Sequence, residues 1–140
     1  AARYHGLVHK IGELRPTTIL EVLEGADACR RPERFELMLL VCEADYRGRT
    51  SYEDRSYVQG ERWRACQAAM RGVDTAAIVR EAANAREAAN ANAPDTAIAR
   101  GTLIARDTGS GNQIADLIRL ARLQAIRQVL AREEYADLLD

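Results

Sequence analysis

Residues 30–49, RRPERFELMLLVCEADYRGR, constrain the fold more than any other stretch of the chain. Pro32 suits the first turn of an α-helix, and Glu33 beside it carries the charge that the helix dipole favours there. The range 35–42 then repeats apolar residues with helical spacing, and further apolar residues fill the positions between them. We therefore expect a helix that is apolar on nearly every side and lies in the middle of a helical bundle.

The rest of the chain repeats this helical pattern, and no window alternates apolar and polar residues clearly enough to predict a strand. With 140 residues, the chain is long enough for one domain with a substantial core. We predict an all-α fold, an irregular bundle of about five to seven helices. Further helices are expected over 2–13 and 61–71, after a Thr18–Glu21 capping box, after an Asp74 N-cap, and after a turn at 109–112.

A short duplication interrupts this pattern. EAANAR at residues 81–86 is followed by EAANAN at 87–92, and two further similar stretches follow Pro94. Duplications this short are typical of an insertion, because the repeats of solenoid proteins are much longer. We expect 82–109 to be a variable insertion in one helical domain covering 1–140. The chain also begins inside a helical pattern and without methionine, which we interpret as a fragment of a larger protein.

Charge and cysteine content narrow the function classes. The net charge of −1 excludes an overall basic field that would attract nucleic acid. Lys10 is the single lysine, and arginine suits phosphate and carboxylate recognition, although a GC-rich genome gives the same bias. The 3 cysteines form no CxxC pair, which is typical of the reducing cytoplasm. No signal peptide and no membrane-spanning apolar run is evident.

Three motifs could carry chemistry. His5 and His9 have the spacing of metal ligands on one helix face, but with no third histidine they are better interpreted as partly exposed helix residues. The charged run 43–49 could be acid–base machinery or a phosphate-binding turn, and a salt-bridge lock on the helix end is the favoured interpretation. Gly109 and Gly111 precede a helix like a phosphate-binding turn, but a plain helix cap is the default.

Several stretches resemble one known family. They are 4–9, 14–19, 27–34, 43–49, 57–60 and 111–122. In this order they resemble the C-terminal part of bacterial multifunctional CCA proteins, which are tRNA nucleotidyltransferases with an HD phosphohydrolase domain. The resemblance covers about residues 1–80 and 109–132 and leaves the duplicated segment unmatched.

The resemblance implies a parent enzyme that adds or repairs the CCA end of tRNA from CTP and ATP with Mg²⁺. The nucleotidyltransferase head and most of the HD domain would lie upstream, so no catalytic residue and no cofactor is expected in this chain. His5 falls where the family places a late metal-binding histidine of the HD site. The family often has aspartate at the next position, which is Gly6 here.

The resemblance further implies that this chain helps to hold tRNA, through phosphate contacts from arginine. The candidate residues are Arg30, Arg31, Arg34, Arg47, Arg49, Arg119 and Arg122. For Arg47 and Arg49, pairing with the carboxylates of 43–49 is at least as good an explanation. Two alternatives stay open: a helical scaffold that forms a homodimer, favoured by a second apolar stripe on the last helix, and an HD-type hydrolase remnant with its own metal.

Overall fold

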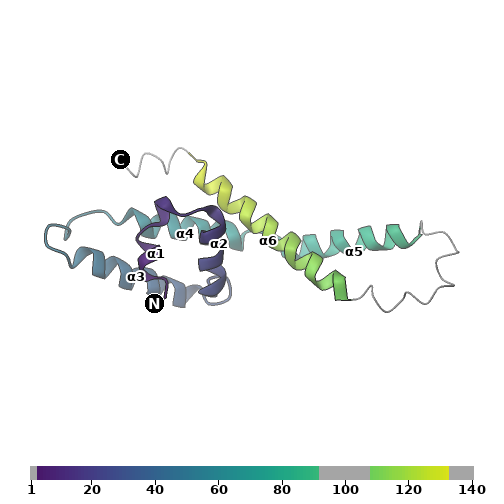
Figure 1. The fold of residues 1–140 in the computed structure, drawn as a ribbon, viewed down its shortest axis with the longest axis horizontal. Coiled ribbons are helices and arrows are strands. Elements are labelled where there is room, and N and C mark those ends of the chain that lie inside the picture. Colours follow the sequence, from purple (N-terminus) through teal and green to yellow (C-terminus); the bar gives the residue numbers. More distant parts are fainter. Residues whose placement is uncertain (1–2, 92–107, 133–140) are drawn as a thin grey trace. The chain divides into compact units, whose positions relative to one another are not determined.

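The computed structural model describes residues 3–91 and 108–132, and every regular element within these ranges is a helix (Figure 1). The predicted all-α fold is confirmed. The chain divides into two compact units, one formed by 1–72 with 122–140 and the other by 73–121. The elements are α1 (His5–Val8), the 3₁₀-helix η1 (Ile11–Glu13), α2 (Pro16–Gly25), α3 (Pro32–Arg47), α4 (Val58–Arg71), α5 (Thr75–Ala91) and α6 (Thr108–Leu130).

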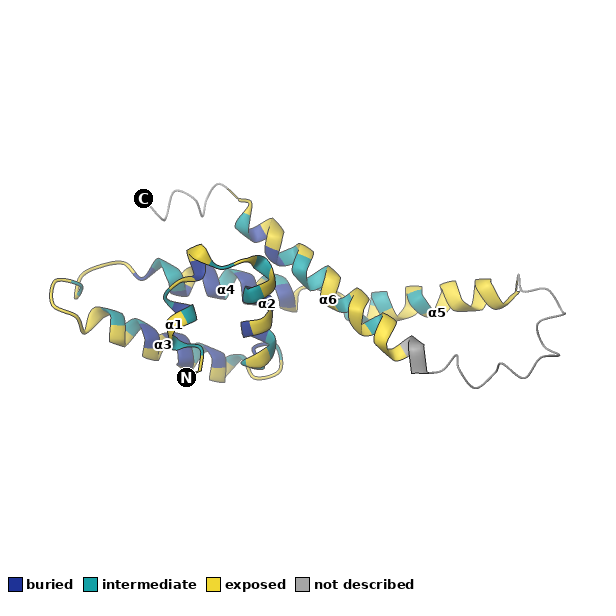
Figure 2. Cartoon of the chain, viewed as in Figure 1, coloured by how far each residue is buried: buried dark blue, intermediate teal, exposed yellow. Residues whose placement is uncertain are grey.

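The unit of 1–72 with 122–140 contains an apolar core (Figure 2). Helix α4 provides its largest side chain, Trp63, which is fully buried and packs edge-on against Phe35 of α3. Cys42 and Cys66 are buried, as their helical positions predict. Ile126 of α6 is also buried. The second apolar stripe of the last helix, from which the sequence suggested a partner, therefore packs into the core of this unit.

Helix α3 is not packed against apolar residues on all sides. The expectation that it lies in the middle of a helical bundle is therefore wrong. Leu37, Leu40 and Val41 are 63%, 47% and 54% exposed, whereas Phe35 and Leu39 are buried. Among the described residues of this unit, α3 packs against α1 and α4, and no described residue covers the face that carries Leu37, Leu40 and Val41. Apolar residues on both sides of a helix do not by themselves specify what covers each side.

Three predicted helix boundaries differ from the structure. The helix expected over 2–13 is broken, because α1 ends at Val8 and a separate 3₁₀ turn follows. Helix α2 begins at Pro16, which occupies the first helical position, so the predicted capping box at Thr18 is not formed. Helix α6 begins at Thr108 and runs through the turn predicted at 109–112.

Asp27 ends α2 in the left-handed conformation, with a φ of 57°. The amide of Asp27 donates to the carbonyl of Glu24, and that of Ala28 donates to the carbonyl of Leu23. These two hydrogen bonds form a Schellman motif, in which glycine is the usual left-handed residue. Gln67 of α4 donates to the Ala28 carbonyl at 2.9 Å, so the turn from α2 to α3 is held from both sides.

The unit of 73–121 contains α5 and the first part of α6. The N-cap predicted at Asp74 is confirmed, since its carboxylate accepts from the Ala77 amide at 2.8 Å. Beyond its first turns α5 is almost entirely exposed (Figure 2). It continues to Ala91 and so includes the start of the predicted insertion, whose residues 92–107 lie outside the described part of the chain. The insertion and the single-domain organisation remain predictions.

Candidate functional site

His5 and His9 come together on the face of α1 that packs against α3. The two Nε2 atoms are 3.3 Å apart, and the imidazole rings meet edge to face. Val8 between them is fully buried, which places α1 firmly on the core. The spacing of four residues therefore places both histidines on the same side, as the sequence predicts, and brings two nitrogen atoms close together.

Helix α3 adds a carboxylate and a thiol to this pair. Asp45 Oδ2 lies 3.4 Å from His5 Nε2 and 3.7 Å from His9 Nε2. Cys42 lies one turn before Asp45, and its Sγ is within 4.8 Å of a nitrogen atom of each histidine. Arg49 holds the same Oδ2 atom of Asp45 at 3.2 Å. We name His5, His9, Cys42 and Asp45 the histidine cluster.

Two tyrosines, Tyr46 and Tyr57, contact the His9 ring. The Tyr57 hydroxyl lies 3.1 Å from His9 Nδ1, and the Tyr46 ring stacks on the imidazole with 6.4 Å between ring centroids. Tyr57 is buried at the start of α4, so it orients His9 rigidly. The sequence does not predict this contact, because it joins residues that are 48 positions apart and no local pattern marks it.

Burial shifts the pKa values of three groups at this site. It lowers the pKa of His9, and the nearby His5 and Arg49 lower it further against the opposing effect of Asp45. Burial also raises the pKa of the Cys42 thiol, an effect that Asp45 adds to, and it raises the pKa of Tyr57. A neutral imidazole can bind a metal ion. A thiol with a raised pKa is both a poor nucleophile and a poor metal ligand, because the thiolate is the active form in both cases. The cluster is thus better suited to binding than to nucleophilic catalysis.

Gly6 follows His5 at the position where the resembled family often has aspartate. A Cβ atom added at Gly6 would meet no other described atom within 4 Å. Packing therefore does not require glycine there, and the carboxylate nearest to His5 comes from α3 instead.

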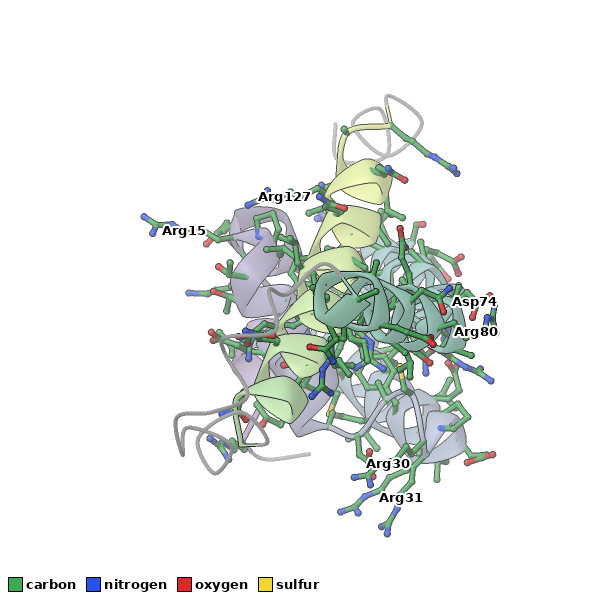
Figure 3. All side chains as sticks on the ribbon, turned by 90° about the vertical axis from the view of Figure 1, so that its right-hand side faces the viewer. Arg15, Arg30, Arg31, Asp74, Arg80 and Arg127 are labelled. Carbon is green, nitrogen blue, oxygen red and sulfur yellow. The ribbon has the colours of Figure 1, made fainter. Side chains whose placement is uncertain are left out.

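The candidate arginines Arg30 and Arg31 lie in the turn between α2 and α3, where both pair with Asp27. Arg30 Nε donates to Oδ1 at 2.7 Å, and Arg31 Nε lies 3.5 Å from Oδ2. Both side chains extend away from the ribbon into solvent (Figure 3). Asp27, in the left-handed conformation, thus holds two guanidinium groups at the turn between α2 and α3.

Arg122 of α6 reaches the same region. It lines a pocket of 220 Å³ together with Asp27 and Arg30. Its Nε is buried and has no hydrogen-bond partner within 3–91 and 108–132. Arg34 lines a neighbouring pocket of 340 Å³, which Asp27 also borders. We name Arg30, Arg31, Arg34 and Arg122 the arginine group. The fold therefore brings together candidates from two distant parts of the sequence.

The other candidate arginines lie elsewhere. Arg47 pairs with Glu43 at 2.8 Å and Arg49 with Asp45, so the salt-bridge lock expected for 43–49 is present. Arg119 belongs to the unit of 73–121 and is already engaged in an interaction. The predicted phosphate turn at Gly109 and Gly111 lies within the start of α6. No helix in the described ranges is both long and apolar enough to cross a bilayer.

Comparison with known proteins gives relatives with one shared description, multifunctional CCA protein. The one from Thioalkalivibrio sulfidiphilus is 55% identical over 80 residues, which are 57% of this chain and 20% of that protein. The one from Nitrosospira multiformis is 51% identical over 82 residues, covering 59% of this chain and 20% of that protein. The one from Burkholderia vietnamiensis is 33% identical over 133 residues, covering 95% of this chain and 26% of that protein. No protein-family model and no solved structure matches the chain.

Fold and site together define an all-α protein in which α1 and α3 bring the histidine cluster together. The chain is a relative of the multifunctional CCA proteins, and the resemblance expected from its motifs is confirmed. It matches their C-terminal region. The chain spans about a fifth of the length of these relatives, 20% for the first two.

Proposed function

We propose that this chain is the C-terminal helical region with which a CCA-adding tRNA nucleotidyltransferase holds tRNA in the cytoplasm. The whole enzyme would add or repair the 3′-terminal CCA of tRNA from CTP and ATP with Mg²⁺. Nucleotide addition would take place in the parts of the relatives that this chain does not match. The relatives' shared description supports the enzyme class. The observation that carries the tRNA-holding role is the convergence of the arginine group around Asp27.

This convergence suits recognition of a phosphate backbone. Guanidinium groups bind phosphate oxygens through paired N–H donors, and such contacts position a nucleic acid without reading its sequence. Because the net charge is −1, attraction must come from a local group of arginines and not from the whole surface. Arg30 and Arg31 are well exposed, with 84% and 62% of their side chains accessible. They are therefore free to exchange the carboxylate of Asp27 for phosphate.

Binding of purified tRNA to the chain tests this proposal. Four phosphate contacts predict a log–log salt slope of roughly −3 to −4, which falls by about one unit for each arginine removed. Arg30→Glu and Arg122→Glu should weaken binding of different tRNAs to the same extent. Arg15→Glu is the matched control, because Arg15 projects from another side of the same unit (Figure 3). Absence of tRNA binding at low salt would exclude the tRNA-holding role.

A second candidate function is the scaffold that forms a homodimer. The specific observation in its favour is the exposed apolar face of α3, formed by Leu37, Leu40 and Val41. Exposed apolar patches often mark contacts between proteins. The mass of the chain in solution tests this candidate. A dimer that Leu40→Glu converts to monomer would support it, whereas a monomer at high concentration would remove it.

A further inference from the structure

The first turns of α4 carry two polar side chains whose buried atoms have no hydrogen-bond partner in the described part of the chain. These atoms are Nε and Nη1 of Arg62 and Oε1 of Gln59. We propose that the two side chains form a binding site for an RNA backbone, in which Arg62 binds a phosphate group and Gln59 accepts a hydrogen bond from the ribose hydroxyl beside it. The site rests on the tRNA-holding role and adds a contact region separate from the arginine group.

Arg62 carries a buried positive charge. Only 9% of the residue is exposed, and an arginine side chain keeps its charge in a folded protein. Its charge acts on the buried thiol of Cys66, where it opposes the rise in pKa that burial causes. Glu61 is the only acidic residue of α4, and it contacts Arg64 instead. A buried charge is costly without an anion beside it, so Arg62 needs one that residues 3–91 and 108–132 do not provide.

Helix geometry directs both side chains to the N-terminal end of α4. Gln59 and Arg62 are three positions apart, so they share one face of the helix. Long side chains on a helix point back toward its N-terminus. That end of α4 has no side-chain cap, and its backbone N–H groups and dipole favour an anion there. The phosphate would approach Nη2, the one guanidinium nitrogen of Arg62 that is not both buried and unpaired.

The two side chains match a ribonucleotide in charge and in the direction of their hydrogen bonds. A guanidinium group has only donors, which suits the acceptor oxygens of phosphate. Gln59 Oε1 is an acceptor and needs a donor. The 2′-hydroxyl of ribose provides such a donor close to the phosphate, and DNA lacks it. The site should therefore favour RNA over DNA, a preference that phosphate contacts from the arginine group alone would not give.

Replacement of Arg62 by methionine tests whether its charge is compensated within the chain. Methionine keeps a long, flexible side chain but removes the charge. If the anion comes from outside, Arg62→Met should raise the melting temperature of the RNA-free chain by roughly 2–8 °C. Arg71→Met is the matched control and should change it little, because Arg71 is an exposed arginine of the same helix. A lower melting temperature in Arg62→Met would show an internal partner and overturn the proposal.

Binding of a tRNA, and of a DNA oligonucleotide of the same sequence, gives the second readout. Wild type should bind the RNA more tightly, with roughly a fivefold share of the preference due to Gln59. Gln59→Leu should lose this share and keep the salt dependence of wild type. Arg62→Met should weaken RNA binding by about tenfold and reduce the log–log salt slope by about one unit. Arg71→Met should leave both properties unchanged.

The same titrations separate this site from the tRNA-holding role itself. If wild type binds tRNA and Arg62→Met binds it equally well with the same salt slope, the site at α4 is overturned and the tRNA-holding role stands. If wild type binds no tRNA at low salt, both are overturned. An RNA preference that Gln59→Leu leaves intact would remove the ribose contact and with it the proposed site.

Discussion

Trp63 of α4 donates its indole N–H to the backbone carbonyl of Val8 at 3.0 Å. Both residues are fully buried, so this hydrogen bond fixes the helix that carries His5 and His9 onto the core. The bond connects two helices that are far apart in the chain and holds the histidine cluster against α3.

Trp63→Phe should therefore destabilise the unit. It keeps an aromatic ring against Phe35 but leaves the buried Val8 carbonyl without its donor, which costs about 1–3 kcal/mol in unfolding free energy. Because Trp63 is the only tryptophan, unfolding is best followed by circular dichroism in urea. Leu37→Ala on the exposed face of α3 is the control and should change stability little. Equal stability of Trp63→Phe and wild type would contradict the role of this bond.

The left-handed turn at Asp27 can be tested with a matched pair of variants. Asp27→Gly and Asp27→Ala both remove the carboxylate that pairs with Arg30 and Arg31. The φ of 57° suits glycine, so Asp27→Gly should be more stable than Asp27→Ala by about 1 kcal/mol. Both variants should bind tRNA more tightly than wild type, since the arginines lose their competing partner. A tRNA affinity that is unchanged or reduced would argue against the arginine group as the tRNA contact.

The ion pair between Glu36 and Arg64 should contribute to stability in a pH-dependent way. Arg64 of α4 donates hydrogen bonds to Glu36 of α3 from Nε at 3.1 Å and from Nη2 at 2.6 Å. Hydrogen bonding to Arg64 holds the pKa of Glu36 below its ordinary value of 4.5. Its stabilisation is therefore present above pH 4.5 and is lost as the pH falls through the lowered pKa. Glu36→Gln should lower the melting temperature at pH 7 and converge with wild type in acid.

Protonation of His9 should change the stability of the chain at a higher pH than protonation of Glu36 does. Burial lowers its pKa below 6.5, so the folded state favours the neutral ring. The contribution of His9 to the stability of the chain should be greatest above pH 6.5 and should fall as the pH decreases from 6.5 toward the lowered pKa, because unfolding then takes up a proton. In His9→Gln, melting temperatures should depend less on pH in this range. An unchanged pH dependence would show that His9 protonates freely in the folded chain.

The sequence alone determined the helical class, most helix positions and the chemistry of several sites. Periodicity identified α3 and α4, Pro32 and Asp74 marked helix starts, and Glu43 and Asp45 emerged as partners of Arg47 and Arg49. These features depend on residues three or four positions apart, for which helix geometry alone decides which side chains meet. The family motifs likewise are local patterns that can be read directly from the chain.

Tertiary packing decided everything that depends on distant residues. Only the fold places Asp45 and Tyr57 beside His9, brings Arg122 to Arg30, and leaves one apolar face of α3 exposed. Periodicity identifies an apolar face but not its neighbour, because the same stripe can be buried by any complementary surface. For this reason the two histidines resembled isolated helix residues in the sequence, and become a cluster once α1 packs against α3.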